Sequence, residues 1–98
     1  MKFHTRQIQR KFKHALDFGV TGNYNQISAA AFQAALQKHV SDKNTQVIKG
    51  TYRGKPAAFY VNMNTRQTVI EDALGNFVSG WKLSKEQLQH VLIDGKLV

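Results

Sequence analysis

The stretch that decides the fold is residues 46–82, QVIKGTYRGKPAAFYVNMNTRQTVIEDALGNFVSGWK. It contains four short segments rich in Val, Ile, Tyr, Phe and Thr, the residue types that strands favour. The segments are Gln46 to Tyr52, Ala57 to Asn62, Gln67 to Asp72 and Asn76 to Lys82. Turn-forming residues separate them, among them Gly54, Pro56 and Gly75. Short strands with tight links predict an antiparallel meander.

A helix is predicted near the N-terminus, from Thr5 as its N-cap to about Leu16. Ile8 and Phe12 share one apolar stripe, because residues four apart lie on the same helix face. Leu16, or Ala15 in its place, continues that stripe. The pattern predicts that this side of the helix packs on the core while the opposite side faces water.

A second helix is predicted from Ser28, as its N-cap, to about Val40. Its body is rich in Ala, and Phe32, Leu36 and Val40 form its apolar stripe. Between the two helices, Gly19 is available for a left-handed residue that ends the first one. The Gly- and Asn-rich residues after Gly19 predict a loop.

The last helix has clear signals at both ends. Ser84 and Gln87 form a capping box at its start. Leu83 can pack against Leu88 as a hydrophobic staple, and Gly95 stops the helix. Its apolar stripe consists of Leu88, Val91 and Leu92.

The order helix, helix, four strands, helix predicts an α+β fold. We expect an antiparallel sheet of four strands, or slightly more, with two N-terminal helices and one C-terminal helix packed on one face. The other face would stay free for a ligand. With 98 residues, 42% of them hydrophobic, the chain has enough material for one domain, residues 1–98, with a modest core.

The charge balance limits the classes of partner. A formal charge of +8 favours nucleic acid, an anionic membrane or an acidic protein. No apolar run approaches the roughly 20 residues that span a bilayer, so no membrane anchor is expected. The absence of cysteine excludes disulfides, thiol catalysis and zinc sites built on Cys.

Basic side chains gather on the first predicted helix before any acidic residue occurs in the chain. They are Arg6, Arg10, Lys11 and Lys13. His14 follows Arg10 and Lys11 by one helical turn, so an imidazole lies among fixed positive charges. Neighbouring cations lower the pKa of His14 while a position in the last helical turn raises it, and the residues alone leave the winner open.

This composition suits RNA cleavage without a metal. The histidines lack close zinc-type pairings, and six carboxylates are few for a two-metal nuclease. RNA carries its own nucleophile, the 2′-hydroxyl, so a protein need only move protons and stabilise charge. A solvated histidine and a wet basic helix face are the ordinary alternatives for this segment.

A second candidate group lies on the last predicted strand. Phe77, Ser79 and Trp81 share one face, and Gly80 leaves the backbone open beside them. A hydroxyl and an indole suit a phosphate oxygen and a stacked base. Burial in the sheet is the ordinary alternative for Trp81, and serine is common in strands.

Several motifs together carry a family resemblance. They are Lys11-Phe12-Lys13-His14, Asp17-Phe18-Gly19-Val20-Thr21-Gly22-Asn23, Thr51-Tyr52-Arg53-Gly54, Gly75-Asn76-Phe77 and Ser79-Gly80-Trp81. With them the chain resembles the catalytic domain of the colicin D family over nearly its whole length. The combination of Lys-x-Lys-His with Ser-x-Trp is specific, whereas either half alone is weak.

The resemblance implies a barnase-like ribonuclease that cuts tRNA in the anticodon region without metal or cofactor. It implies that His14 is the catalytic acid and base, and that Lys11, Lys13, Ser79 and Trp81 support cleavage or binding. It also implies a small acidic immunity protein as partner, with the domain otherwise monomeric. The domain would be the toxic tip of a longer secreted bacteriocin or contact-dependent inhibition protein, acting in the target bacterium's cytoplasm.

The hypothesis from the sequence is therefore an anticodon-type tRNA endonuclease that leaves a 2′,3′-cyclic phosphate and a 5′-hydroxyl. The nucleic-acid-binding residues would be Arg6, Arg10, Arg53, Lys55 and Lys82. Two alternatives stay open: a non-catalytic RNA-binding module, and a basic domain whose charge serves an acidic protein partner. RNA cleavage distinguishes the first hypothesis from both.

Overall fold

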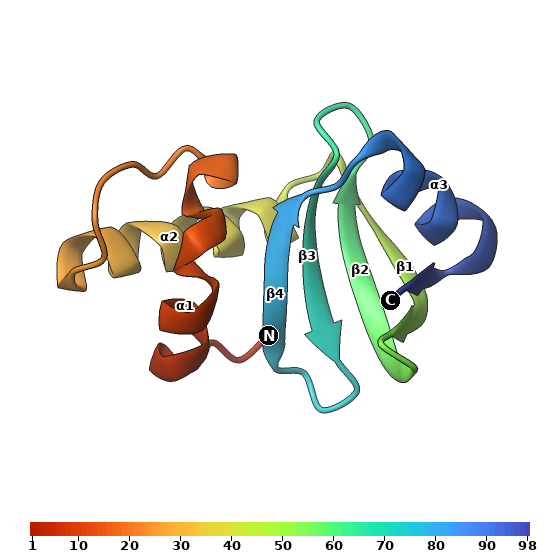
Figure 1. Cartoon of the computed structure of the whole chain (residues 1–98), viewed down its shortest axis with the longest axis horizontal. Helices are drawn as coiled ribbons and strands as arrows, with labels where there is room; N and C mark the ends of the chain where they lie inside the picture. The colour runs from red at the N-terminus through yellow and green to blue at the C-terminus, as the bar shows by residue number, and fades with distance from the viewer.

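Four consecutive strands form the antiparallel meander that the sequence predicts (Figure 1). They are β1 (Thr45–Tyr52), β2 (Lys55–Asn62), β3 (Gln67–Asp72) and β4 (Phe77–Lys82). The structure, a computed structural model, describes residues 1–98. β3 has the predicted bounds, and β2 begins two residues before the predicted Ala57 because its pairing with β1 runs up to the tight turn at Arg53 and Gly54.

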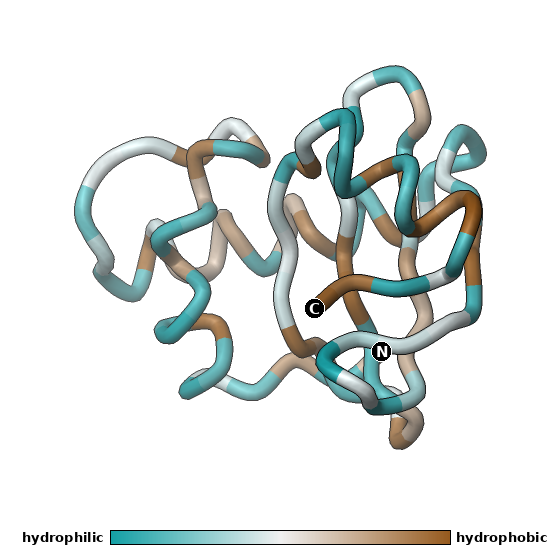
Figure 2. Tube along the Cα trace, turned by 45° about the vertical axis from the view of Figure 1, so that its right-hand side comes forward, coloured by the Kyte–Doolittle hydropathy of each residue, from teal (hydrophilic) through white to brown (hydrophobic).

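A fifth strand, β5 (Lys96–Leu97), pairs in parallel with β1 and was not predicted. The sheet order is β4-β3-β2-β1-β5, so the sheet is mixed. Two residues are too few to show a periodic pattern. The chain leading into β5 approaches β1 closely at Gly50, where a Cβ would overlap the carbonyl oxygen of Gly95. In Figure 2 the hydrophobic C-terminal end lies beside the strands, and Leu97 belongs to the core.

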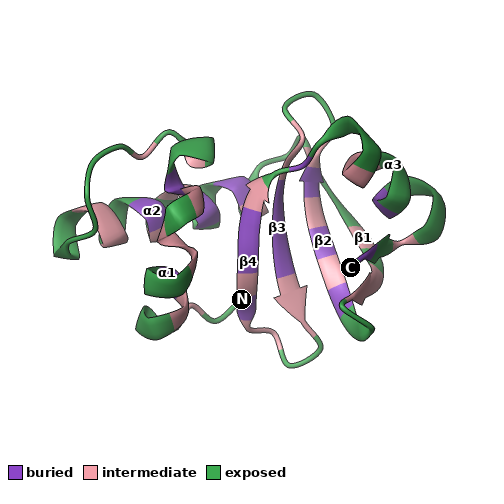
Figure 3. Ribbon diagram, in the orientation of Figure 1, coloured by how far each residue is buried: buried purple, intermediate pink, exposed green.

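Helices cover both faces of the sheet, which corrects the expectation of helices on one face, while the α+β class is confirmed. Adjacent residues of a strand point to opposite faces. Val69 packs with Ile8 of α1 (Thr5–Lys11) and with α2 (Gln26–Ser41), whereas Ile70 packs with Val91 of α3 (Lys85–Asp94). Figure 1 shows α1 and α2 beside β4 and α3 on the far side of the sheet, and Figure 3 shows buried residues on β2, β3 and β4.

The first helix is shorter than predicted. α1 ends at Lys11 and continues as a 3-10 helix, η1 (Phe12–Phe18), and its N-cap is His4 rather than Thr5. In a 3-10 helix, residues three apart share a face. Ala15 therefore follows Phe12 into the core at 2% exposure, and Leu16 is 69% exposed, so the Ala15 alternative is correct. Gly19 ends η1 in the predicted left-handed conformation.

α2 begins earlier than predicted, because Asn25 and not Ser28 is its N-cap. The Ser28 amide donates to Asn25 Oδ1 and the Asn25 amide donates to Ser28 Oγ, each at 2.9 Å. Ser28 thus belongs to the cap from the third helical position. In the last helix, α3, the predicted capping box and left-handed Gly95 are confirmed, whereas Leu92 is 45% exposed and lies outside the buried stripe.

Candidate active site

The structure brings the two candidate groups of the sequence together. His14 lies on η1, Trp81 lies on the edge strand β4, and their ring centroids are 5.8 Å apart with a 35° tilt. A helix at the N-terminus and a strand close to the C-terminus therefore build one site. The site lies where η1 packs along the β4 edge of the sheet.

Hydrogen bonds and close packing fix η1 against β4. Asp17 Oδ2 accepts from the Lys82 amide at 2.9 Å, and the Asp17 carbonyl accepts from Gln67 Nε2 at 2.8 Å. A Cβ at Gly80 would lie 3.1 Å from Leu36 Cδ2 and 3.4 Å from Phe18 Cζ. Glycine at this position lets the 3-10 segment that carries His14 approach the strand.

Burial and positive charge lower the pKa of His14 below its ordinary value of 6.5. Partial burial is the largest cause, and the charges of Lys13 and then Lys11 act in the same direction. Asp17 opposes them more weakly. The structure thus decides the question that the sequence left open, because the pKa of His14 is lowered and not raised.

The pKa of Lys11 is also lowered from its ordinary value. Burial lowers its pKa first, followed by the charges of Lys13, Arg53 and Arg10. Arg53 lies in the β1–β2 turn, so a residue far away in sequence joins the cationic group around His14. Like charges held this close cost stability in the free protein and attract a polyanion.

Tyr52 is a site residue that the sequence analysis missed. Its ring centroid lies 6.2 Å from that of Trp81, and Arg53 Cζ lies 5.2 Å from the Tyr52 centroid. The Arg53 amide donates to the Leu97 carbonyl at 2.8 Å, so β5 holds Arg53 in its left-handed conformation. The sequence did offer one signal for Tyr52, an aromatic residue next to an arginine in a turn. The proximity of Tyr52 to Trp81, however, depends on how the sheet forms.

Gln87 anchors the indole of Trp81. Trp81 Nε1 donates to Gln87 Oε1 at 3.2 Å, and the same oxygen accepts from the Ser84 amide at 2.9 Å. The side chain that completes the α3 capping box therefore also orients the tryptophan that faces His14. The sequence predicted the capping box and gave no sign of the bond to the indole.

Ser79 is buried beneath the site. It is 1% exposed, its Cα partner across the sheet is Ile70, and its hydroxyl has no hydrogen-bond partner. A buried polar group without a partner costs about 1–3 kcal/mol. The hydroxyl is thus an unused hydrogen-bonding group on the strand that carries Trp81.

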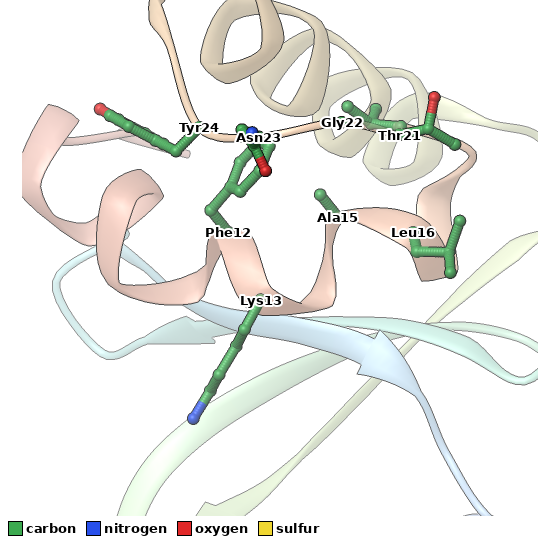
Figure 4. Close-up of a pocket in the computed structure, with 9 residues that line it drawn as sticks. Phe12, Lys13, Ala15, Leu16, Thr21, Gly22, Asn23 and Tyr24 are labelled. Atoms are coloured by element: carbon green, nitrogen blue, oxygen red, sulfur yellow. The ribbon is translucent and has the colours of Figure 1, made fainter.

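The other predicted binding residues lie around this centre. Arg6 and Arg10 line a hollow of about 350 Å³ between α1 and β4. Lys55 lines another hollow on the α3 face of the sheet, and Lys82 is exposed at the end of β4. The hollow of about 460 Å³ in Figure 4 lies on the opposite side of η1, and the Lys13 side chain points away from it.

No three side chains of His, Asp or Glu come together as a metal site would require. No helix of the structure combines the length and hydrophobicity that crossing a membrane requires.

These features define a small basic α+β domain whose edge-strand site is centred on one histidine and one tryptophan. The Colicin D family model matches residues 7–91, and the chain belongs to this family. Colicin-D of Escherichia coli is 41% identical over 87 residues, which are 87% of this chain and 12% of that protein. The solved structure of a ribonuclease from Escherichia coli complexed with its inhibitor protein matches with a TM-score of 0.83 and 39% identity, covering 93% of this chain and 100% of that one.

Proposed function

We propose that this domain is a metal-independent endoribonuclease toxin that cleaves tRNA in the anticodon region. The observation that carries the proposal is the position of His14, which lies close to Lys11 and Lys13 and has its ring 5.8 Å from that of Trp81, with Arg53 near Lys11. Membership of the Colicin D family supports a toxin. The structural neighbour, a ribonuclease held by an inhibitor protein, supports ribonuclease activity here.

The proposed reaction begins with the 2′-hydroxyl of the substrate. Neutral His14 accepts its proton as the 2′-oxygen bonds to phosphorus, and the P–O5′ bond breaks. His14 then gives the proton to the leaving 5′-oxygen, so the products are a 2′,3′-cyclic phosphate and a 5′-hydroxyl. Lys11 and Lys13 stabilise the extra negative charge on the pentacovalent phosphate.

The remaining proposed roles are binding roles. The Ser79 hydroxyl, which is buried and without a partner in the free domain, holds a non-bridging phosphate oxygen once substrate binding uncovers it, and Trp81 stacks on or shapes the substrate. Arg6, Arg10, Arg53, Lys55 and Lys82 contact the RNA backbone. A small acidic immunity protein binds the same cationic surface and blocks it, and the domain is otherwise monomeric.

We further propose that residues 1–98 are the toxic tip of a longer secreted protein and act in the cytoplasm of the target bacterium. The relative in Escherichia coli supports this, because the chain matches only 12% of it. No proposed step requires a cofactor.

The test is a gel of total bacterial tRNA incubated with the domain in EDTA. We expect one discrete fragment pair, and His14→Ala should reduce its rate by about 10²–10⁴-fold, the usual contribution of general acid–base catalysis. His90→Ala is the matched control, because His90 lies on α3 and pairs with Asp94. Equal cleavage by His14→Ala would refute the mechanism, and intact RNA throughout would favour a non-catalytic binding module.

A further inference from the structure

A hollow of about 220 Å³ lies on the α3 face of the sheet, at the end formed by the β1–β2 and β3–β4 turns. It is lined by Tyr52, Pro56, two charged residues and three apolar residues. The charged residues are Lys55 and Asp72, and the apolar ones, called its floor below, are Ala57, Ile70 and Val78. Of the residues that line this hollow, only Lys55 has a role in the proposed function, and the hollow itself has none.

A run of neighbouring rings connects the hollow to the proposed catalytic centre. Tyr52 lines it, the Tyr52 and Trp81 centroids are 6.2 Å apart, and those of Trp81 and His14 are 5.8 Å apart. Arg53 lies over Tyr52 and is close enough to Lys11 to lower its pKa. An RNA strand with its reactive phosphate at His14 would therefore bring a neighbouring nucleotide to the hollow.

The shape and polarity of the hollow match one nucleobase. Drug-sized ligands occupy pockets of about 300–1,000 Å³, so this smaller hollow suits a single ring system. Bases in single strands are bound by stacking on aromatic side chains and by hydrogen bonds to their edges. Tyr52 and the apolar floor offer the first kind of contact, while Lys55 and Asp72 offer a donor and an acceptor.

Asp72 is a preorganised acceptor. Its Oδ1 accepts from the amides of Leu74 and Asn76, each at 2.9 Å, and Oδ2 accepts from Asn76 Nδ2 at 3.2 Å. The bond from the Asn76 amide is the largest cause that lowers the pKa of Asp72, so the carboxylate stays ionised. A fixed carboxylate within a cationic surface favours a ligand whose N–H groups can donate hydrogen bonds to it.

We propose that this hollow is a nucleobase subsite for a nucleotide next to the scissile phosphate, and that Asp72 favours bases with an exocyclic amino group over uracil. This inference rests on the proposed function, because it assigns a substrate contact beside the same centre. Adenine, cytosine and guanine carry such an amino group, and uracil carries none. The chain would then read one base directly, in addition to the backbone charge that its arginines and lysines contact.

The test measures binding without cleavage. Trp81 is the only tryptophan and lies next to Tyr52, so its fluorescence reports titration with CMP, AMP, GMP or UMP. CMP should bind about tenfold more tightly than UMP, the effect of one hydrogen bond to a charged group. Asp72→Asn should remove most of this difference, and Ala57→Leu, which fills the hollow, should weaken all four nucleotides equally relative to inorganic phosphate.

Equal binding of CMP and UMP by the unaltered domain, or no binding of any nucleotide at millimolar concentration, would overturn the subsite. This comparison needs no variant, so poor folding of Ala57→Leu cannot obscure it. RNA cleavage that depends on His14 without a CMP preference would refute the subsite alone. A CMP preference without any RNA cleavage would support the subsite and refute the nuclease.

Discussion

The first and last helices of this domain differ in what holds them. α3 has a side-chain capping box at one end and a left-handed glycine at the other. α1 has no side-chain cap bond, no acid in its first turn, and gives way to a 3-10 helix at Phe12. Local interactions therefore define α3, whereas α1 and η1 depend on the rest of the molecule.

The contacts of α1 and η1 show how that dependence works. Ile8 and Ala15 are each 2% exposed, Gln7 Nε2 donates to the Val78 carbonyl at 2.6 Å, and Asp17 bonds the end of β4. The segment that carries His14 and its neighbouring lysines is thus positioned by the sheet. The difference teaches that charge changes on α1 and η1 should alter activity, while cap changes on α3 should alter stability.

The largest expected effect is on activity alone. His14→Ala should lose about 10²–10⁴-fold in the RNA cleavage rate, with a thermal midpoint that does not fall, because the imidazole contributes no hydrogen bond to the fold. Cleavage kinetics and a thermal melt on the same preparation measure both. A large drop in the midpoint would show that η1 carries stability as well as chemistry.

The next largest effect is expected at Gln87, whose side chain bonds both the α3 cap and the Trp81 indole of the candidate site. Gln87→Leu and Ser84→Ala should each cost about 1 kcal/mol of stability by breaking the cap. Only Gln87→Leu also frees the Trp81 indole, so it alone should lower kcat, by about tenfold, the scale of one hydrogen bond, and shift Trp81 fluorescence. Gln87→Glu, which keeps an acceptor, should restore both. Equal activity of Gln87→Leu and Ser84→Ala would reject this positioning role.

A smaller effect is expected on the pH dependence of cleavage, which should respond to a charge change on η1 but not to one on α3. The neutral imidazole accepts the proton, and its pKa is lowered in the free domain, so the acidic limb of the log kcat/KM profile, which reports the free enzyme, should lie below the ordinary 6.5. Lys13→Gln removes one cause of the lowering and should move this limb upward. Lys85→Gln on α3 is the control and should leave it in place. If Lys13→Gln left the acidic limb unchanged, the titrating group would not be His14.

The same shift has a consequence for stability. The pKa values of His14 and His39 are lowered in the folded state, chiefly by burial. The unfolded chain therefore takes up these protons first, so the stability present above pH 6.5 is lost as the pH falls through the lowered folded-state values. Denaturant titrations at several pH values should show this slope, and His14→Ala should reduce it. An unchanged slope in that variant would assign the effect to His39.

The smallest expected effect is that of one peripheral charge. Arg10→Gln should weaken RNA binding a few-fold and reduce the salt slope of log K by about one unit. Lys43→Gln, in the connector between α2 and β1, should leave the slope unchanged. Binding by the His14→Ala domain at several salt concentrations measures both. Equal slopes would remove Arg10 from the RNA contact surface.

The sequence by itself determined the strands of the meander, the capping box of Ser84 and Gln87, and the positive charge before Asp17. Side-chain alternation, cap hydrogen bonds and charge order act between residues that are close in sequence, and for that reason they can be predicted from it. The Lys-x-Lys-His and Ser-x-Trp motifs identified the family for the same reason, because each is a local pattern.

Only the tertiary structure decided the parallel β5, the 3-10 form of η1, and the run of contacts from His14 through Trp81 and Tyr52 to Arg53. It also decided that the pKa of His14 falls, since burial outweighs the other causes. Desolvation, ring contacts and charge–charge interactions depend on distances between segments far apart in the chain. Those distances exist only once the sheet has formed and drawn the segments together.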